Sequence, residues 1–102
     1  MLELRKEKKG GSSSPTKDME KVLSSLANRD ALEIFHEAKD GITNSTETIG
    51  KLGLTQKRYY ARLKPLIGTG LIQKTEKGYN LTFLGKIIYE ILYRKLAKTL
   101  ES

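Results

Sequence analysis

The stretch TETIGKLGLTQKRYYARLKPLIGTGLI, residues 46 to 72, predicts two short helices joined by a tight turn and followed by a β-strand. Asn44 or Ser45 can cap the first helix, over residues 46 to 52, because their side-chain oxygens can accept from the free N–H groups of its first turn. Gly53 then supplies a residue that enters the left-handed conformation without a Cβ penalty. The two helices are therefore predicted to meet at a sharp angle.

The second helix of this stretch is predicted to begin after Thr55 as its cap and to extend to about Ile67. Pro65 conflicts with a helix interior, so it either kinks the last turn or falls where that turn is already loosening. The apolar positions expected to face the core are Tyr59, Leu63, Leu66 and Ile67. The opposite side is predicted to carry Lys57, Ala61 and Lys64, with Arg58 and Tyr60 on its flanks and Gln56 and Arg62 at its borders.

The positive charge of the chain is concentrated in and after this helix. The net charge of the chain is +7. Residues 54 to 81 hold six basic residues and one acidic residue, whereas residues 18 to 53 hold four basic and seven acidic residues. Basic charge gathered on one local surface is typical of a protein that binds a polyanion. The alternative is a basic surface that serves only solubility.

Length and composition limit the rest of the chain. With 102 residues the chain is predicted to be one domain, residues 17 to 102, preceded by a flexible basic tail over residues 1 to 16. The tail's basic residues, which either touch phosphates or are merely solvated, are Arg5, Lys6, Lys8 and Lys9. The absence of cysteine excludes disulfides, thiolate zinc sites and a cysteine nucleophile. Because there is no apolar run of membrane-spanning length and no signal-peptide core, we expect a cytoplasmic, nucleoid-associated protein.

Two scaffold helices are predicted before the central stretch. Asp18 is expected to cap a helix over residues 19 to 27, and Asn28 one over residues 29 to 40. His36 lies beside the apolar side of the latter and is the only histidine in the chain. One histidine without cysteines favours a position on the helix surface or at its boundary over metal ligation, so no metal site and no cofactor are predicted.

A hairpin and a long helix are predicted to follow. After a short extended segment at residues 42 and 43, strands are expected at residues 71 to 74 and 79 to 82. The tip of this hairpin, at Glu76, Lys77 and Gly78, would then project as a short basic loop.

The last helix, over residues 84 to 100 after a Thr82 cap, carries an apolar stripe wider than one packing contact needs. We interpret the excess as a dimer surface, formed by Leu84, Ile88, Ile91, Leu92 and Leu96. Packing within one chain is the alternative.

Three segments together resemble a known family. LSSLANRDALEIFHEA, residues 23 to 38, resembles the opening helices of ArsR-like transcription regulators, and IGKLGLTQKRYYARLKPLIGTGLI, residues 49 to 72, resembles their helix-turn-helix. The motif Y-x-L-T-x-x-G, from Tyr79 to Gly85, is similar to the end of their wing. Compact archaeal winged-helix regulators, and the MarR-like and PadR-like families, share these signatures.

The resemblance implies a mainly α fold with a small β-hairpin, a winged helix-turn-helix whose long C-terminal helix dimerises. It also implies a homodimeric transcription regulator that binds double-stranded DNA, with helix 55 to 67 in the major groove and the wing, 73 to 79, on the backbone or minor groove. The implied DNA-binding residues are Thr55, Gln56, Lys57, Arg58, Tyr60, Lys64, Lys74 and Lys77. The metal-sensing role of some ArsR-like proteins does not carry over, because their cysteine or histidine clusters are missing.

Two other functions compete with DNA binding. One is a winged-helix protein-interaction module of a larger complex, in which the basic side meets an acidic partner; the outward cluster of Lys57, Arg58 and Lys64 argues against it. The other is an enzyme, which we do not expect, because the sequence has no assembled nucleophile set, no phosphate-binding glycine loop and no paired carboxylates in an apolar setting. The sequence identifies no effector ligand.

Overall fold

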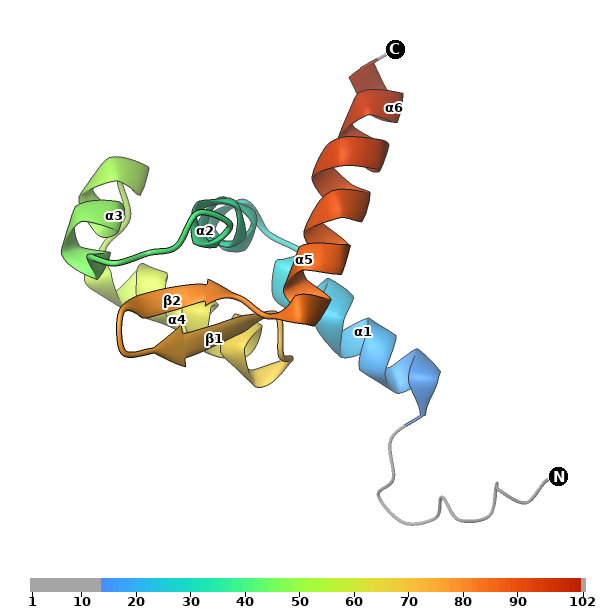
Figure 1. Ribbon diagram of the computed structural model, residues 1–102, viewed down its shortest axis with the longest axis horizontal. Helices are drawn as coiled ribbons and strands as arrows, with labels where there is room; N and C mark the ends of the chain where they lie inside the picture. Colours follow the sequence, from blue (N-terminus) through green and yellow to red (C-terminus); the bar gives the residue numbers. More distant parts are fainter. Residues whose placement is uncertain (1–13, 102) are drawn as a thin grey trace, which may run out of the picture.

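The computed structural model describes residues 14–101, and this part of the chain is mainly helical with a small two-stranded antiparallel hairpin (Figure 1). The coarse fold class predicted from the sequence is confirmed. The elements occur in the order α1 (Pro15–Leu26), α2 (Arg29–Ala38), α3 (Ser45–Leu52), α4 (Gln56–Gly68), β1 (Ile72–Thr75), β2 (Gly78–Leu81), α5 (Phe83–Tyr89), η2 (Glu90–Leu96) and α6 (Ala97–Glu101). Residues 1–13, most of the predicted tail, lie outside the described range.

The start of the first helix differs from the prediction. Helix α1 begins at Pro15 rather than at residue 19, and its cap is Ser14, whose Oγ accepts from the Lys17 backbone N–H at 3.1 Å. Proline suits the first helical position because its missing N–H would be unpaired there in any case. Asp18, predicted as the cap, lies instead in the first turn.

The other predicted helix caps are confirmed. Side-chain oxygens of Asn28, Thr55 and Thr82 accept from backbone N–H groups three residues ahead, at 2.8 to 3.1 Å. Asn44, not Ser45, caps α3. These short polar side chains satisfy N–H groups that a helix start leaves without partners. The predicted end of α2 at residue 40 is two residues too late.

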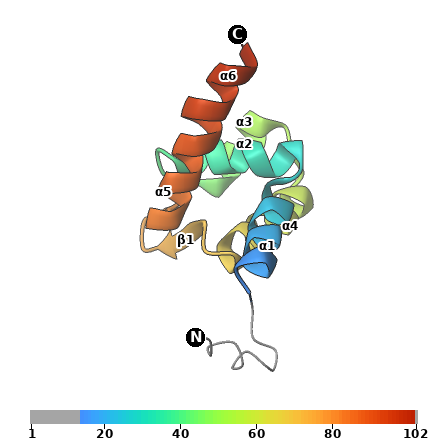
Figure 2. The ribbon, with the colours of Figure 1, turned by 90° about the vertical axis from the view of Figure 1, so that its right-hand side faces the viewer.

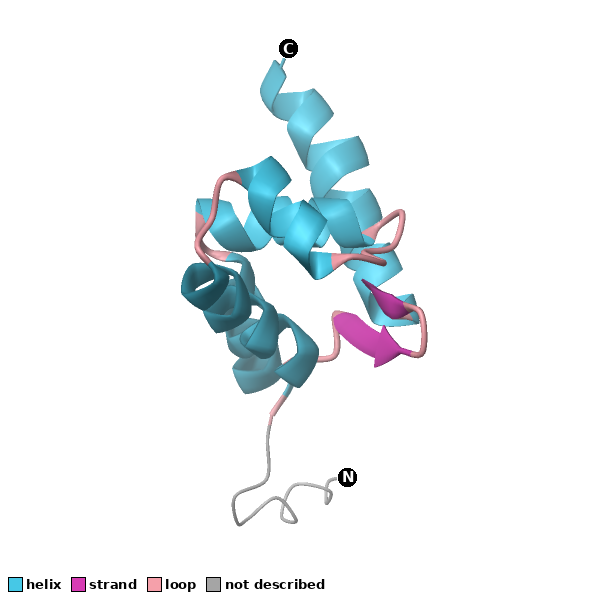
Figure 3. Ribbon diagram, turned by 90° about the vertical axis from the view of Figure 1, so that its left-hand side faces the viewer, coloured by secondary structure: helices cyan, strands magenta, loops and turns pink. Residues whose placement is uncertain are grey.

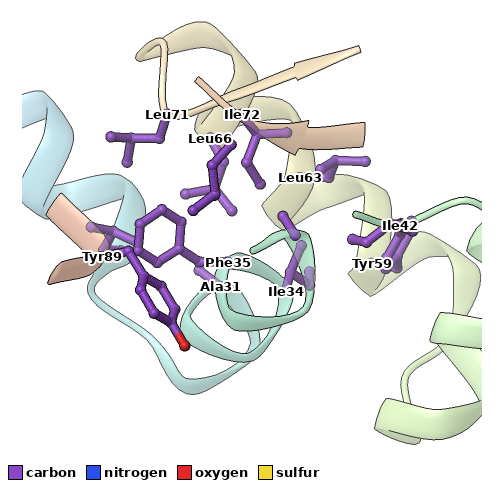
Figure 4. Packing of buried hydrophobic residues seen from close by; sticks show 13 residues of the cluster. Ala31, Ile34, Phe35, Ile42, Tyr59, Leu63, Leu66, Leu71, Ile72 and Tyr89 are labelled. Atoms are coloured by element: carbon purple, nitrogen blue, oxygen red, sulfur yellow. The ribbon is translucent and has the colours of Figure 1, made fainter. Parts of the chain in front are cut away.

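The core lies where α2, α4 and the hairpin meet (Figure 4). Its largest fully buried side chains are Tyr59, Phe35, Ile34, Leu63, Leu66, Leu71 and Ile72. The predicted burial of Ile67 is wrong, since 37% of it is exposed. At 100° per residue, Ile67 lies roughly 80° from Tyr59, at the edge of the apolar stripe. Helix α4 continues through Pro65 to Gly68.

The hairpin is joined to the loop that follows α2. Strand β1 lies one residue later in the sequence than predicted, and β2 lies one residue earlier. Ile72 pairs with Leu81 and Thr75 with Gly78. The extended segment after α2 also forms a bridge, in which Ile42 and Tyr79 exchange backbone hydrogen bonds of 2.7 and 2.9 Å. Figure 3 shows the two strands at one edge of the helical part of the molecule.

The end of the chain is one long helical rod that extends away from the other elements (Figures 1 and 2). Its middle part, η2, is a π-helix, which the sequence pattern did not predict. The Ala97 backbone N–H bonds to the Leu92 carbonyl, five residues back. None of the helices in residues 14–101 has the length and apolar character needed to cross a membrane.

Candidate nucleic-acid interface

Helix α4 has one buried side and one exposed side. Tyr59, Leu63 and Leu66 are almost fully buried against the rest of the domain. The exposed residues from its start to Lys64, called the basic face below, are Gln56, Lys57, Arg58, Tyr60, Ala61, Arg62 and Lys64. An uncovered helix that carries cations and an amide has the size and chemistry to enter the major groove of a duplex.

The turn between α3 and α4 fixes the start of the basic face. Gly53 has φ +70°, and its N–H bonds to the carbonyls of Ile49 and Gly50, which closes α3. The Thr55 hydroxyl oxygen then accepts from the Arg58 backbone N–H at 3.1 Å. Thr55, a predicted DNA contact, thus also caps α4.

Tyr59 connects the buried side of α4 to α3. Its hydroxyl and that of Ser45 are 2.8 Å apart, so one donates to the other. Burial raises the pKa of Tyr59, and the Ser45 hydrogen bond opposes that effect in part. The two helices are therefore held together by a partly buried polar contact in addition to apolar packing.

Arg58 does not project freely from the basic face. Its guanidinium donates to both carboxylate oxygens of Asp30, in the first turn of α2, with Nη2 to Oδ2 at 2.9 Å and Nε to Oδ2 at 3.2 Å. Sequence reasoning missed Asp30, because an acid in the first turn of a helix usually only complements the helix dipole. Nothing local signals a partner 28 residues away.

Tyr60, whose position the sequence left open, is partly exposed. It keeps 40% of its surface accessible while its ring meets that of Tyr59 edge to face, with centroids 4.8 Å apart. The Tyr60 ring is thus held in place by its contact with Tyr59, and its exposed part stays available to a ligand.

The predicted wing residues lie on the hairpin. Lys74 pairs across the strands with Tyr79, and its Nζ lies 5.6 Å from the centre of that ring. Lys77 is at the tip, where its backbone N–H donates to the Thr75 Oγ1 at 3.2 Å. Both lysines are exposed, and α4 packs beside β1.

A second basic site was not predicted. Arg62, placed at a border by the sequence pattern, lines a hollow of about 480 Å³ between α1 and α4 together with Lys21. The buried floor includes Ser25, whose hydroxyl lies 3.4 Å from that of Thr69. The sequence offered no signal for Lys21, because the pattern of α1 is that of a scaffold helix.

The terminal helix divides the predicted dimer residues into two groups. Ile91 and Leu96 are about half exposed, and Leu84 is also open to solvent. Ile88 and Leu92, by contrast, pack against the core of their own chain. The predicted residues divide in this way because the terminal helix is amphipathic and one side of it packs against α2.

His36 is an exposed residue that contacts the terminal helix. Its Nδ1 is 2.8 Å from the Tyr89 hydroxyl, and its ring lies 5.0 Å from that of Tyr93. The Tyr93 hydroxyl donates to the Leu32 carbonyl at 3.0 Å. Burial raises the pKa of Tyr93, with Tyr89 and Glu33 adding to the effect. These contacts attach the rod to α2 and involve no metal-binding cluster within residues 14–101.

Comparison with models of protein families, with curated proteins and with solved structures gives no match for this chain.

Proposed function

We propose that this chain is a homodimeric transcription regulator that binds double-stranded DNA through a winged helix-turn-helix. In this proposal α3 and α4 are the helix-turn-helix, α4 enters the major groove, and the hairpin is the wing, which reaches the backbone or the minor groove. The observation that carries it is the basic face of α4, which is uncovered directly opposite the buried seam of Tyr59, Leu63 and Leu66.

Several features support this assignment of roles. The turn at Gly53 lets α3 brace α4 while the first turn of α4 stays exposed. Lys57 and Lys64 lie about two helical turns apart on the basic face, and Lys77 is at the hairpin tip. Cations at such positions can contact phosphates on both sides of a groove, and an exposed Gln56 can bond to an adenine edge.

Dimerisation is proposed through the terminal helix. Exposed apolar residues on a projecting rod are unfavourable in water, and a second rod packed against them would remove that surface from solvent. Two copies of α4 would then meet successive major grooves, roughly 34 to 36 Å apart.

The test is a fluorescence-anisotropy titration of the full chain with duplex DNA over a range of salt. If Lys57, Lys64 and Lys77 of both copies meet phosphates, log affinity falls against log salt with a slope of about −5. Replacing Lys57 and Lys64 together with glutamine should reduce the slope to about −2. Lys86→Gln, on α5, is the control and should leave the slope unchanged.

A slope near zero for the unaltered chain would rule the proposal out. A second experiment selects bound sequences from a random duplex library and measures the mass of the protein–DNA complex, which tests whether the protein binds as a symmetric dimer. The expected result is an enriched palindrome bound by two chains. Retention of DNA binding in Arg58→Glu together with loss of a protein pull-down would instead favour the protein-interaction module.

A further inference from the structure

We propose that Asp30 determines specificity in DNA recognition by holding the guanidinium of Arg58 in the orientation that reads a guanine. This inference rests on the proposed function and assigns a role to a residue of α2, outside the helix-turn-helix. The evidence is the geometry of one ion pair between α2 and α4.

The pair is bidentate and unequally exposed. Arg58 donates from Nη2 to both carboxylate oxygens, at 2.9 and 3.1 Å, and from Nε to Oδ2 at 3.2 Å. The Asp30 side chain is only 19% exposed, whereas that of Arg58 is 57% exposed. The carboxylate is thus a largely covered anchor, and more than half of the Arg58 side chain is open to solvent on the basic face.

The unused edge of the guanidinium is the one that recognition needs. A guanidinium presents five N–H donors in a planar fork. Asp30 occupies the Nε side, and no hydrogen bond or ion pair within residues 14–101 uses Nη1. The outer edge, Nη1 with the second N–H of Nη2, keeps two parallel donors. Two such donors match O6 and N7 of guanine in the major groove.

Anchoring favours selectivity in two ways. A free arginine loses rotamer entropy when it docks on a base, whereas an arginine already held in one orientation loses less. The carboxylate also opposes the approach of phosphate to Arg58, which weakens binding that depends on charge alone. Because more than half of the Arg58 side chain is exposed, solvent screens the pair and its contribution to folding is modest.

The test compares full-length variants on three duplexes: the selected consensus, single base-pair changes of it, and a random sequence, all at one salt concentration. Asp30→Asn keeps the side-chain shape and removes the anchor. The expected result is at least a fivefold fall in the preference for consensus over random, concentrated at one G·C pair. Affinity for random duplex should stay equal or rise, since one negative charge is gone.

Glu47→Gln is the matched control. Glu47 lies in the first turn of α3, so this change removes the same charge from a neighbouring helix start without touching Arg58. The preference for consensus should be unchanged. Arg58→Gln should lose the same G·C discrimination, and adding Asp30→Asn to it should cause no further loss, since both residues act through one contact.

Equal rises of affinity for consensus and random DNA in Asp30→Asn would overturn the inference, because Asp30 would then only repel phosphate. An unchanged preference in a folded Asp30→Asn variant would overturn it as well. In both cases the unaltered chain still binds duplex selectively, so the proposed function stands. If the unaltered chain binds no duplex, both proposals fail together.

Discussion

Gly78 is the residue at which the hairpin meets the loop after α2. Its φ is +132°, and a Cβ placed there would lie 2.0 Å from the Ile42 carbonyl oxygen. Both the backbone angle and the contact therefore exclude a side chain. The wing proposed for DNA contact is held against the domain at a position that only glycine can occupy.

We expect Gly78→Ala to lower the free energy of unfolding by at least about 2 kcal/mol, because it combines backbone strain with a steric clash. The measurement is a urea titration followed by circular dichroism. Gly50→Ala is the control: this glycine is in α3, and a Cβ added to it would have no neighbour within 4 Å, so it should gain up to about 1 kcal/mol. A Gly78→Ala protein as stable as the original would contradict the clash.

Tyr59 makes stability depend on pH at the alkaline end. Its pKa in the folded protein is raised above 10.0, chiefly by burial, so the folded state holds the phenolic proton more tightly than the unfolded state does. The stabilisation is complete below pH 10 and declines as the pH rises above 10 toward the folded-state pKa. Tyr93 contributes with the same sign.

Tyr59→Phe should therefore flatten part of the alkaline decline, as measured by urea titrations at neutral pH and above pH 10. At neutral pH it should cost about 1 kcal/mol, because Ser45 loses its hydrogen-bond partner. An alkaline decline as steep as that of the unaltered chain would mean that another group titrates.

At the scale of elements, the terminal helix carries the prediction on oligomeric state. Ile91 is half exposed on the π-helical segment, so Ile91→Glu should leave the fold intact and weaken dimerisation at least tenfold, through a charge forced into an apolar contact. Sedimentation velocity at several concentrations measures it. Lys86→Glu adds the same side chain at an exposed position about 160° around α5 from Leu84 and should leave a dimer; equal behaviour of both variants would argue against this surface.

The π-helix also explains why the apolar stripe was only partly predictable. The predicted stripe assumes 3.6 residues per turn, but the hydrogen bonds of η2 run over five residues. Ile91 and Leu96, five apart, would lie about 140° apart on an α-helix. In η2, where backbone hydrogen bonds join residues five apart, they are about one turn apart and lie closer to one side. No local signal distinguishes this segment from an ordinary helix.

What the sequence predicted well was local in origin. Asn28, Thr55 and Gly53 act on backbone groups within a few residues, so their roles follow from residue type and spacing alone. The exposure of Lys57 and Lys64 followed from helical periodicity. Their contact with DNA stays a prediction.

The features that the sequence did not predict depend on tertiary contacts. The Arg58–Asp30 pair joins two helices far apart in the sequence, and the exposure of Ile67 depends on how far its neighbours cover α4. Periodicity assigns a residue to a side of a helix but cannot say which partner lies there.

At the scale of the whole molecule, the proposed dimer places two basic faces at a defined separation. Because the chain has no cysteine, Lys57→Cys gives a single site for a spin label in each copy. Pulsed electron paramagnetic resonance should show a maximum at roughly 34 to 36 Å. A maximum far from this range, or no dipolar coupling between copies, would contradict the geometry proposed for the dimer.

The contact of Tyr89 and Tyr93 with α2 has a consequence for how such a protein would evolve. The polar contacts between the terminal rod and α2 are made by these two rings with His36 and the Leu32 carbonyl, beside the apolar packing of Ile88 and Leu92. In the proposed dimer, a substitution at this contact changes the separation of the two α4 helices without changing any residue that touches a base. Lineages could then diverge in the spacing of their target sites while keeping α4 intact, so half-site sequence and half-site spacing would be inherited as separate traits.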